Sequence, residues 1–287
     1  MIHYFNREKQ LNNHGLCCRF GLDVSRAIDL QRQRKPPRHA VASSTQVGAA
    51  PRRGFDYDLA VQFLRRAMLL FAHRGYHVEA PENSLAAFEA AVRLGVDGIE
   101  TDVRLSRDGL PVIIHDRVTP RKRAVADLTR RQIEVDVGHP VPTLPEILDA
   151  FPDVRWNIEI KNPEAWPAAS RVLAQFQGTR RLLVTSFRHD VVKQCADQLA
   201  IDCGLLLAHR PLDVGAIMAG CAGQPRIRAI VWDYNVTDEN VLQAVAAGGW
   251  RNFVYGAATP AEHQRCMALG LAGVITDYPP LIMETRA

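Results

Sequence analysis

The sequence predicts an α/β fold, a (β/α)8 TIM barrel, over residues 68–287. From residue 68 onward, short apolar runs rich in valine, isoleucine and leucine alternate with helix-like stretches, which is the pattern of repeated βα units. About 220 residues of such repetition fit an eight-stranded barrel. The alternative is an open, doubly wound sheet. Its nucleotide-binding versions find no support, because no GxGxxG or GxxxxGK[ST] motif follows an expected strand.

Nine segments have the composition of strands, one more than the barrel needs. A parallel crossover takes a dozen or more residues, and only a short segment containing SRDG joins the second and third candidates. These two form either a local hairpin or one strand that bends at Asp108-Gly109. In chain order the candidates are LLFAH (69–73), GIETDV (98–103), PVIIH (111–115), WNIEI (156–160), LLVTSF (182–187), GLLLA (204–208), AIVWDY (229–234), FVYGA (253–257) and GVITDY (273–278).

The helices between these strands carry clear terminal signals. Ser84 or Asn83 can cap the helix in SLAAFEAAVRLG, and Gly95 ends it. Two further helix starts, at Thr143–Glu146 and Thr259–Glu262, have the sequence of a capping box. The helical stretches therefore have defined ends, as expected for the outer layer of a barrel.

The positive charge of the chain is concentrated at its N-terminus. The formal net charge is +4 and the isoelectric point about 8.8, a balance that suggests an anionic partner. Residues 1–67 hold 12 lysines and arginines against 5 acidic residues, whereas residues 68–287 hold 23 against 26. We interpret residues 1–67 as an irregular extension that is either disordered or, if translation starts at Met68, not part of the native protein. An anion-binding or membrane-surface arm is the third interpretation.

Several classes of protein are disfavoured by composition. No stretch of 18 apolar residues predicts a membrane span, and the N-terminus lacks the apolar run of a signal peptide. The six cysteines show no CxxC pair and no zinc spacing. We therefore expect a cytoplasmic protein with reduced thiols and no stable membrane insertion. Nucleic acid is not an expected partner, because the barrel region is net negative and has no basic stripe with interleaved aromatic residues.

Acidic side chains lie within two expected strands, where an uncompensated charge is costly. In GIETDVRL the two-residue period places Glu100 and Asp102 on one face, opposite the apolar residues. In WNIEIKN it places Glu159 and Lys161 on the inward face. Three carboxylates at the mouth of a barrel repel one another unless a cation neutralises them, and oxygen ligands favour Mg²⁺ or Ca²⁺. The alternative is an internal salt bridge to Lys161 or Arg104, which would leave two carboxylates uncompensated.

Two histidines end expected strands in the same region. His73 ends LLFAH and His115 ends PVIIH, and each is followed by a charged residue. A single histidine in an apolar strand is more often structural than catalytic. Two at strand ends near an acidic cluster favour catalysis, since histidine titrates near neutral pH and one can act as base and the other as acid. The other eight histidines, including His77, are interpreted as surface or structural residues.

Seven motifs occur in an order that resembles one enzyme family. They are AHRG (72–75), PENS (81–84), GIETDVRLSRDGLPVIIHD (98–116), PTLPEIL (142–148), IEIK (158–161), SF (186–187) and ITDYP (275–279). Together they resemble the glycerophosphodiester phosphodiesterase family of the phospholipase C-like phosphodiesterase superfamily. The resemblance covers residues 68–287 and none of residues 1–67. It implies a TIM barrel that uses one divalent cation to cleave glycerophosphodiesters, as small-molecule substrates, to sn-glycerol 3-phosphate and an alcohol.

The resemblance also implies a role for each candidate residue. Five residues correspond to the metal ligands and the acid–base pair: Glu100, Asp102 and Glu159, and His73 and His115. Arg74 and Lys161 match positions near the phosphate, where a guanidinium can bind two oxygens and an ammonium adds a point charge. Glu82, in PENS, is a residue of the site wall or outer metal shell, or a loop residue that binds backbone N–H groups. Phe187 and Tyr255 correspond to substrate-contacting aromatic positions.

The sequence departs from the family pattern after the third strand. The segment between His115 and Pro142 is shorter than the usual insertion, which helps to form a cap over the site. A shorter cap could admit larger diesters, including lysophospholipids. The alternative function is therefore a phospholipase D-like barrel that acts on lysophospholipids or sphingolipids. A non-catalytic phosphodiester-binding protein is less favoured, because it would be expected to have lost one of the five site residues.

Overall fold

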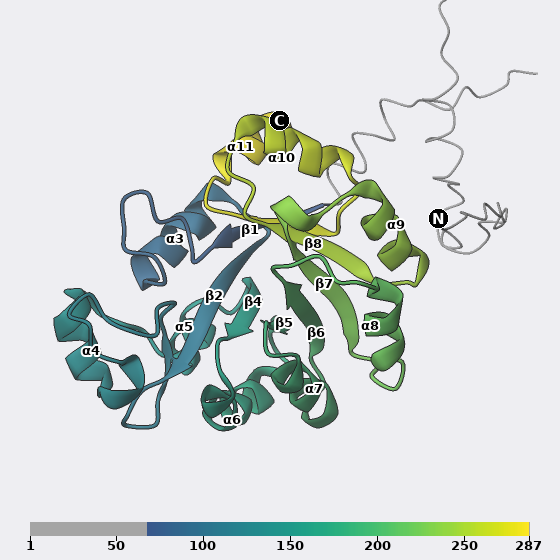
Figure 1. Ribbon diagram of the computed structural model, residues 1–287. Coiled ribbons are helices and arrows are strands. Elements are labelled where there is room, and N and C mark those ends of the chain that lie inside the picture. The colour runs from purple at the N-terminus through teal and green to yellow at the C-terminus, as the bar shows by residue number, and fades with distance from the viewer. Residues whose placement is uncertain (1–67, 287) are drawn as a thin grey trace, which may run out of the picture. The chain divides into compact units, whose positions relative to one another are not determined.

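The barrel predicted from the sequence is confirmed. The computed structural model describes residues 68–286, which contain a closed barrel of eight parallel strands (Figure 1). The predicted extension, residues 1–67, lies outside the described residues. The strands pair in the order β1-β9-β8-β7-β6-β5-β4-β2, and a pairing of β1 with β2 closes the barrel. The barrel strands are β1 (Leu69–His73), β2 (Gly98–Leu105), β4 (Arg155–Ile160), β5 (Arg181–Ser186), β6 (Asp202–Leu207), β7 (Ile227–Asp233), β8 (Arg251–Tyr255) and β9 (Gly273–Thr276).

Helices surround the strands, as Figure 1 shows. Outward-facing side chains such as Ile99, Trp156 and Val254 belong to the main core, which the helices share. A smaller cluster inside the barrel includes Phe71 and Phe253, whose rings meet edge to face with centroids 6.1 Å apart. The helices are α3 (Leu85–Leu94), α4 (Arg130–Val137), α5 (Leu144–Ala150), α6 (Trp166–Phe176), α7 (His189–Gln198), α8 (Val214–Gly220), α9 (Glu239–Ala247), α10 (Pro260–Ala268) and α11 (Pro280–Arg286), with single 3₁₀ turns η1 (Val125–Asp127), η2 (Pro163–Ala165) and η3 (Tyr234–Val236).

The ninth strand is half of a hairpin. β3 (Pro111–Ile113) runs antiparallel to β2, and Gly109, with φ of 78°, supplies the left-handed turn residue between them. Of the two arrangements that the sequence left open, the hairpin is therefore the correct one. β3 ends at Ile113, two residues earlier than predicted, so His115 lies in the loop beyond it.

The predicted helix ends are also confirmed. Ser84, rather than Asn83, caps α3: its side chain accepts a hydrogen bond from the Ala87 N–H at 3.2 Å. Gly95 ends that helix in the left-handed conformation. The capping boxes at the starts of α5 and α10 are present as well.

An insertion between β3 and α5, residues 114–143, contains η1 and α4. In Figure 1, α4 lies outside the ring of helices around the barrel. The insertion has its own apolar cluster, in which Ile133 of α4 is fully buried with Val112, Val125 and Leu128. This cluster gives the insertion a local core separate from the main one.

We expect Ile133→Ala to loosen the insertion. The change removes buried methyl groups and should lower local stability by about 2–5 kcal/mol. Hydrogen exchange followed by mass spectrometry should show lost protection within residues 114–143 and little change in the barrel strands. Val135→Ala, on the same helix but 54% exposed, is the control and should change little. Equal exchange in the two variants would show that the cluster does not hold the insertion.

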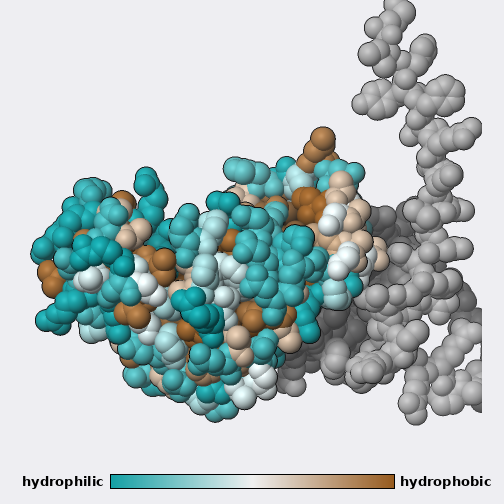
Figure 2. Space-filling model, turned by 90° about the horizontal axis from the view of Figure 1, so that it is seen from below, coloured by the Kyte–Doolittle hydropathy of each residue, from teal (hydrophilic) through white to brown (hydrophobic). Residues whose placement is uncertain are grey.

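The face in Figure 2 is largely hydrophilic, and its apolar residues form small separate patches. Within residues 68–286 no helix combines the length and apolar character needed to cross a membrane.

Candidate active site

Three acidic side chains meet towards the carboxyl-terminal end of the barrel. Glu100 and Asp102 lie on β2, and Glu159 lies on β4, where it pairs in register with Asp102. All three are buried, and one oxygen of each lies within 4.8 Å of the others. Strand alternation thus brings together the three carboxylates that the sequence pattern placed on the inward faces. Such a group could hold a metal ion.

Burial and neighbouring charges change the acidity of this cluster. Burial raises the pKa of Glu100 well above its usual value, and the negative charges of Asp102 and Glu159 raise it further. Burial also raises the pKa of Glu159. Burial acts in the same direction on Asp102, but the charges of Lys161 and Arg74 outweigh it and lower the pKa of that carboxyl. Two cationic side chains therefore do not compensate three carboxylates.

The donor set fits a hard divalent cation. It consists of carboxylate oxygens, the ligands that Mg²⁺ and Ca²⁺ prefer. Apart from its ion pair with Lys161 Nζ at 3.2 Å, the buried Asp102 Oδ1 has no hydrogen-bond partner among residues 68–286. A buried acceptor without a donor is costly, and a cation would compensate it. Lys161 also lies 2.8 Å from Glu159, so an internal salt bridge is present, but it does not involve Glu100.

A tight turn after β1 directs Arg74 towards the carboxylates. Arg74 has φ of 55°, which is unusual for a residue with a side chain, and Gly75 follows with φ of 84°. A Cβ atom on Gly75 would lie 2.8 Å from the Ala87 backbone, so only glycine fits there. Arg74 Nε lies 3.3 Å from Asp102, and its NH1 group lies 2.9 Å from Glu82. Glu82 stands outside the carboxylate cluster and holds the Arg74 side chain.

His73, the last residue of β1, lies beside the cluster. It pairs in register with Glu100, and its Nε2 atom is 3.8 Å from Glu100 Oε2. Its Nδ1 atom is 2.7 Å from Asp277 Oδ1, which also lies 3.0 Å from His77 Nε2. Burial would raise the pKa of Asp277, but the hydrogen bonds with the two histidines hold it far below its usual range. An ionised Asp277 therefore orients His73 and leaves Nε2 directed towards the cluster.

His115 reaches the site from the returning strand of the hairpin. The N–H of Ile114 donates to the backbone oxygen of Asp102 at 3.0 Å, which fixes the position of the next residue. His115 Nδ1 lies 2.9 Å from Asp116 Oδ1. Burial lowers the pKa of His115, although the charge of Asp102 acts in the opposite direction. His73 thus lies next to Glu100, and His115 directly follows a residue bonded to Asp102, and each histidine has its Nδ1 atom beside a carboxylate.

Comparison with known proteins decides the family. The model of the glycerophosphoryl diester phosphodiesterase family matches residues 73–281. The chain belongs to this family. A glycerophosphodiester phosphodiesterase from Caldanaerobacter subterraneus subsp. tengcongensis is 30% identical over 244 residues, which is 75% of this chain and 96% of that one. The chain is therefore an enzyme, a phosphoric diester hydrolase.

Solved structures of this family share the fold. The glycerophosphodiester phosphodiesterase of Thermotoga maritima matches with a TM-score of 0.66 and 27% identity, over 76% of this chain and 98% of that one. A phosphodiesterase from Oleispira antarctica, solved in complex with its product sn-glycerol-3-phosphate, has a TM-score of 0.68 and 22% identity. That match covers 76% of this chain and 96% of the other. The family resemblance stated from the motifs is confirmed.

The two aromatic residues that the family resemblance singled out contact each other. Phe187, directly after β5, and Tyr255, at the end of β8, meet edge to face with ring centroids 6.2 Å apart. Phe187 is 44% exposed. Burial raises the pKa of Tyr255, and the charges of Asp233 and Glu159 raise it further. Both residues stand where a barrel strand ends, so the two rings form an apolar wall at the carboxyl-terminal end of the barrel.

Three residues of the site were not assigned a role from the sequence. Asp277 and Asn83 stand in the family motifs ITDYP and PENS, but nothing in the motifs predicted their contacts. Asn83 has φ of 56° and donates from Nδ2 to Asp102 at 2.8 Å while accepting from Thr101 at 2.8 Å. His77 gave no signal, and its interpretation as a surface or structural residue did not anticipate its contact with Asp277. Asp277 and Asn83 contact His73 and Asp102, two residues of the predicted site, whereas His77 contacts Asp277.

Proposed function

We propose that this enzyme hydrolyses glycerophosphodiesters to sn-glycerol 3-phosphate and an alcohol, with one divalent cation held by Glu100, Asp102 and Glu159. The observation that carries the proposal is a buried triad of carboxylates with two histidines close by: His73 lies 3.8 Å from Glu100, and His115 directly follows Ile114, whose N–H is bonded to Asp102. Family membership supplies the substrate class, and the product bound in the Oleispira antarctica phosphodiesterase is the one proposed here.

The side chains around the cluster divide the chemical work. When bound, the cation supplies a Lewis acid beside the phosphate and stabilises the charge that develops in the transition state. Arg74 and Lys161 add positive charge beside Asp102. The planar guanidinium of Arg74 can bind two phosphate oxygens, and the ammonium of Lys161 acts as a point charge. His73 and His115 act through their Nε2 atoms. One accepts a proton from the nucleophile, and the other donates a proton to the leaving oxygen. Their Nδ1 atoms remain held by Asp277 and Asp116.

The insertion and the aromatic wall bear on the size of the substrate. We propose that residues 114–143 form a short cap and that Phe187 and Tyr255 contact the glycerol or alcohol part of the diester. A second candidate, cleavage of lysophospholipids, is favoured by one observation: Phe187 is 44% exposed and could contact an acyl chain. Small glycerophosphodiesters remain the main proposal, because the groups that face the carboxylates are ionic.

Metal dependence and substrate choice can be measured together. The purified protein should release sn-glycerol 3-phosphate from glycerophosphocholine with Mg²⁺ or Ca²⁺, and EDTA should reduce the rate at least about 100-fold. Re-addition of the cation should restore the rate, which excludes damage by the chelator. Lysophosphatidylcholine, which would yield choline and lysophosphatidate, should be cleaved more slowly when choline release is compared for the two substrates.

Three results would contradict the proposal in different ways. Full activity in EDTA would show that the reaction needs no divalent cation. Faster cleavage of lysophosphatidylcholine would establish the second candidate. Release of phosphocholine and glycerol, in place of choline and sn-glycerol 3-phosphate, would show that the other phosphoester bond is cut.

A further inference from the structure

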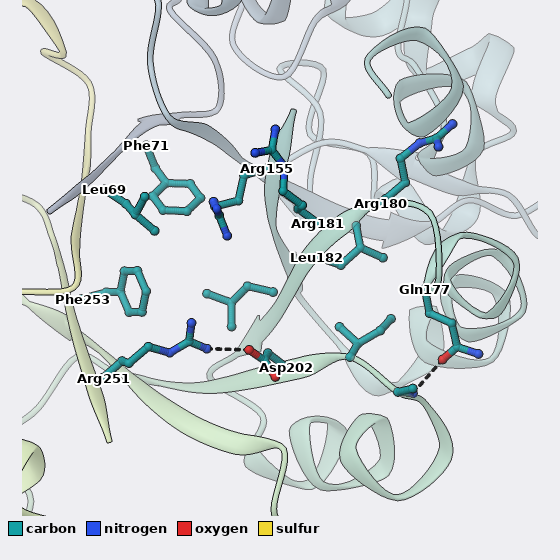
Figure 3. A pocket seen from close by; sticks show the side chains of 13 residues that line it. Leu69, Phe71, Arg155, Gln177, Arg180, Arg181, Leu182, Asp202, Arg251 and Phe253 are labelled. Carbon is teal, nitrogen blue, oxygen red and sulfur yellow. Dashed lines mark hydrogen bonds and ion pairs between the residues drawn. The ribbon is translucent and has the colours of Figure 1, made fainter. Parts of the chain in front are cut away.

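A second polar site lies at the opposite end of the barrel from the carboxylates. A cavity of about 260 Å³ is lined by the first residues of several barrel strands, among them Arg155 of β4, Arg181 of β5 and Arg251 of β8 (Figure 3). Arg180, next to β5, also lines it, and Asp202 is its one acidic lining residue. The lining therefore has an excess of positive charge, although the described barrel region as a whole is net negative in sequence.

Strand alternation explains why one strand serves both ends. On β4, residues 155, 157 and 159 share the inward face, so Arg155 faces the cavity and Glu159 faces the carboxylate cluster. The two residues are four steps apart along the strand, about 13 Å. The apolar cluster that includes Phe71 and Phe253 fills the barrel between the ends. The cavity is thus separate from the candidate active site.

The arginines that line this cavity have too few negatively charged partners. Arg155 and Arg181 are direct register partners on neighbouring strands, an arrangement that is unfavourable for two like charges. The buried Nε atom of Arg155 has no hydrogen-bond partner within residues 68–286. Arg181 donates to the backbone oxygen of Asp153, a neutral acceptor. Only Arg251 has a carboxylate partner in the lining, Asp202 at 2.9 Å, and this pair appears as a dashed line in Figure 3.

The electrostatics of Arg155 agree with this geometry. Burial lowers its pKa, and the positive charges of Arg181 and Arg251 lower it further, whereas Asp97 acts in the opposite direction. A buried polar group without a partner is costly and is usually satisfied by a ligand, ion or water. An oxyanion placed between the arginines would supply acceptors to Arg155 and Arg181 at once, because guanidinium groups bind phosphate and carboxylate oxygens in pairs.

We propose that this cavity binds the phosphate group of a small organic phosphate monoester. The arginines would hold the phosphate oxygens, and the apolar lining beside them, which includes Leu69, Phe71 and Phe253, would contact the organic substituent (Figure 3). Phosphate is favoured over a carboxylate because it carries more charge and offers acceptors to several arginines. The apolar lining favours a substituted phosphate over the inorganic ion.

Calorimetric titration of the full-length protein in EDTA tests the proposal with two probes, inorganic phosphate and butyl phosphate. Both should bind saturably, and butyl phosphate should bind more tightly. Arg155→Gln and Arg181→Gln should each weaken binding at least about tenfold. Arg228→Gln is the matched control: Arg228 lies near the same end of the barrel on β7 but is exposed and outside the cavity lining, and its loss changes the net charge equally.

A melting temperature separates an anion site from arginines that only stabilise the fold. Without phosphate, Arg155→Gln should keep or raise the melting temperature, because it removes a repelled charge, and butyl phosphate should no longer raise it. Unchanged affinity in both cavity variants, or no saturable binding to the wild-type protein, would overturn the proposal. So would a variant that melts lower while the wild-type protein gains nothing from the ligand. None of these measurements depends on diester hydrolysis, so their failure would leave the proposed function standing.

Discussion

Replacing His115 with alanine is expected to lower turnover of glycerophosphocholine by about 10²–10⁴-fold, the usual contribution of a general acid or base. The hairpin of β2 and β3 returns the chain to Asp102 and places the imidazole beside the carboxylates. Burial lowers the pKa of His115, which favours the neutral ring. His73→Ala should produce a loss of the same size, since its Nε2 atom lies 3.8 Å from Glu100 in the cluster.

A variant that lacks both His73 and His115, together with a control variant, tests this prediction further. If the histidines act as an acid–base pair in one reaction, the double variant should be little slower than either single variant, because groups that act as a unit are not additive. His139→Ala, in the insertion, where the ring contacts the adjacent Pro140 oxygen, should keep turnover within about twofold. Thermal melts should show that all variants fold. Near-normal turnover in either single variant would defeat the assignment of that histidine.

Much of the site could be predicted because it depends on strand periodicity. The two-residue period placed Glu100, Asp102 and Glu159 on inward faces, and the parallel register of β2 and β4 brings them together. His73 ends β1 as predicted, whereas His115 lies in the loop two residues after the end of β3. The choice between a hairpin and a bent strand at Gly109 could not be made, because both accommodate glycine with a positive φ.

The parts of the site that were not predicted from the sequence depend on contacts between segments far apart in the chain. Asp277 reaches His73 across 204 positions of the chain, and only closure of the barrel by β1 and β9 brings them together. Asn83 was considered as a helix cap, a role that Ser84 takes, and the left-handed conformation of Asn83 instead directs its amide to Asp102. The arginine cavity gave no signal, because Arg155, the pair Arg180-Arg181 and Arg251 are far apart in the sequence and become neighbours only when the barrel closes.

Glu100→Gln is expected to have the largest effect on metal binding and activity. Glutamine keeps the size of the side chain and removes the charge, so a cation loses one of three carboxylate ligands. Loss of a residue that only supports a metal ligand typically costs 10–100-fold in affinity or activity, and loss of a ligand should therefore cost more than about 100-fold. Activity against glycerophosphocholine and the gain in melting temperature on adding Mg²⁺ or Ca²⁺ should both be lost.

The same variant should behave in the opposite way without metal. Burial and the charges of Asp102 and Glu159 raise the pKa of Glu100, so its ionised form destabilises the folded protein at neutral pH. Because the pKa of Glu100 is raised in the folded protein, this group favours folding at low pH. That contribution to stability is lost as the pH rises from the pKa of the unfolded state through the pKa of the folded state. In EDTA at pH 7, Glu100→Gln should therefore melt higher than the wild-type protein. Glu89→Gln, which removes an exposed charge on α3 paired with Arg93, should change neither the melting temperature nor the response to metal. A Glu100→Gln protein that melts lower in EDTA, or that keeps its stabilisation by the cation, would show that Glu100 is a structural partner of the cluster and that the metal is held elsewhere.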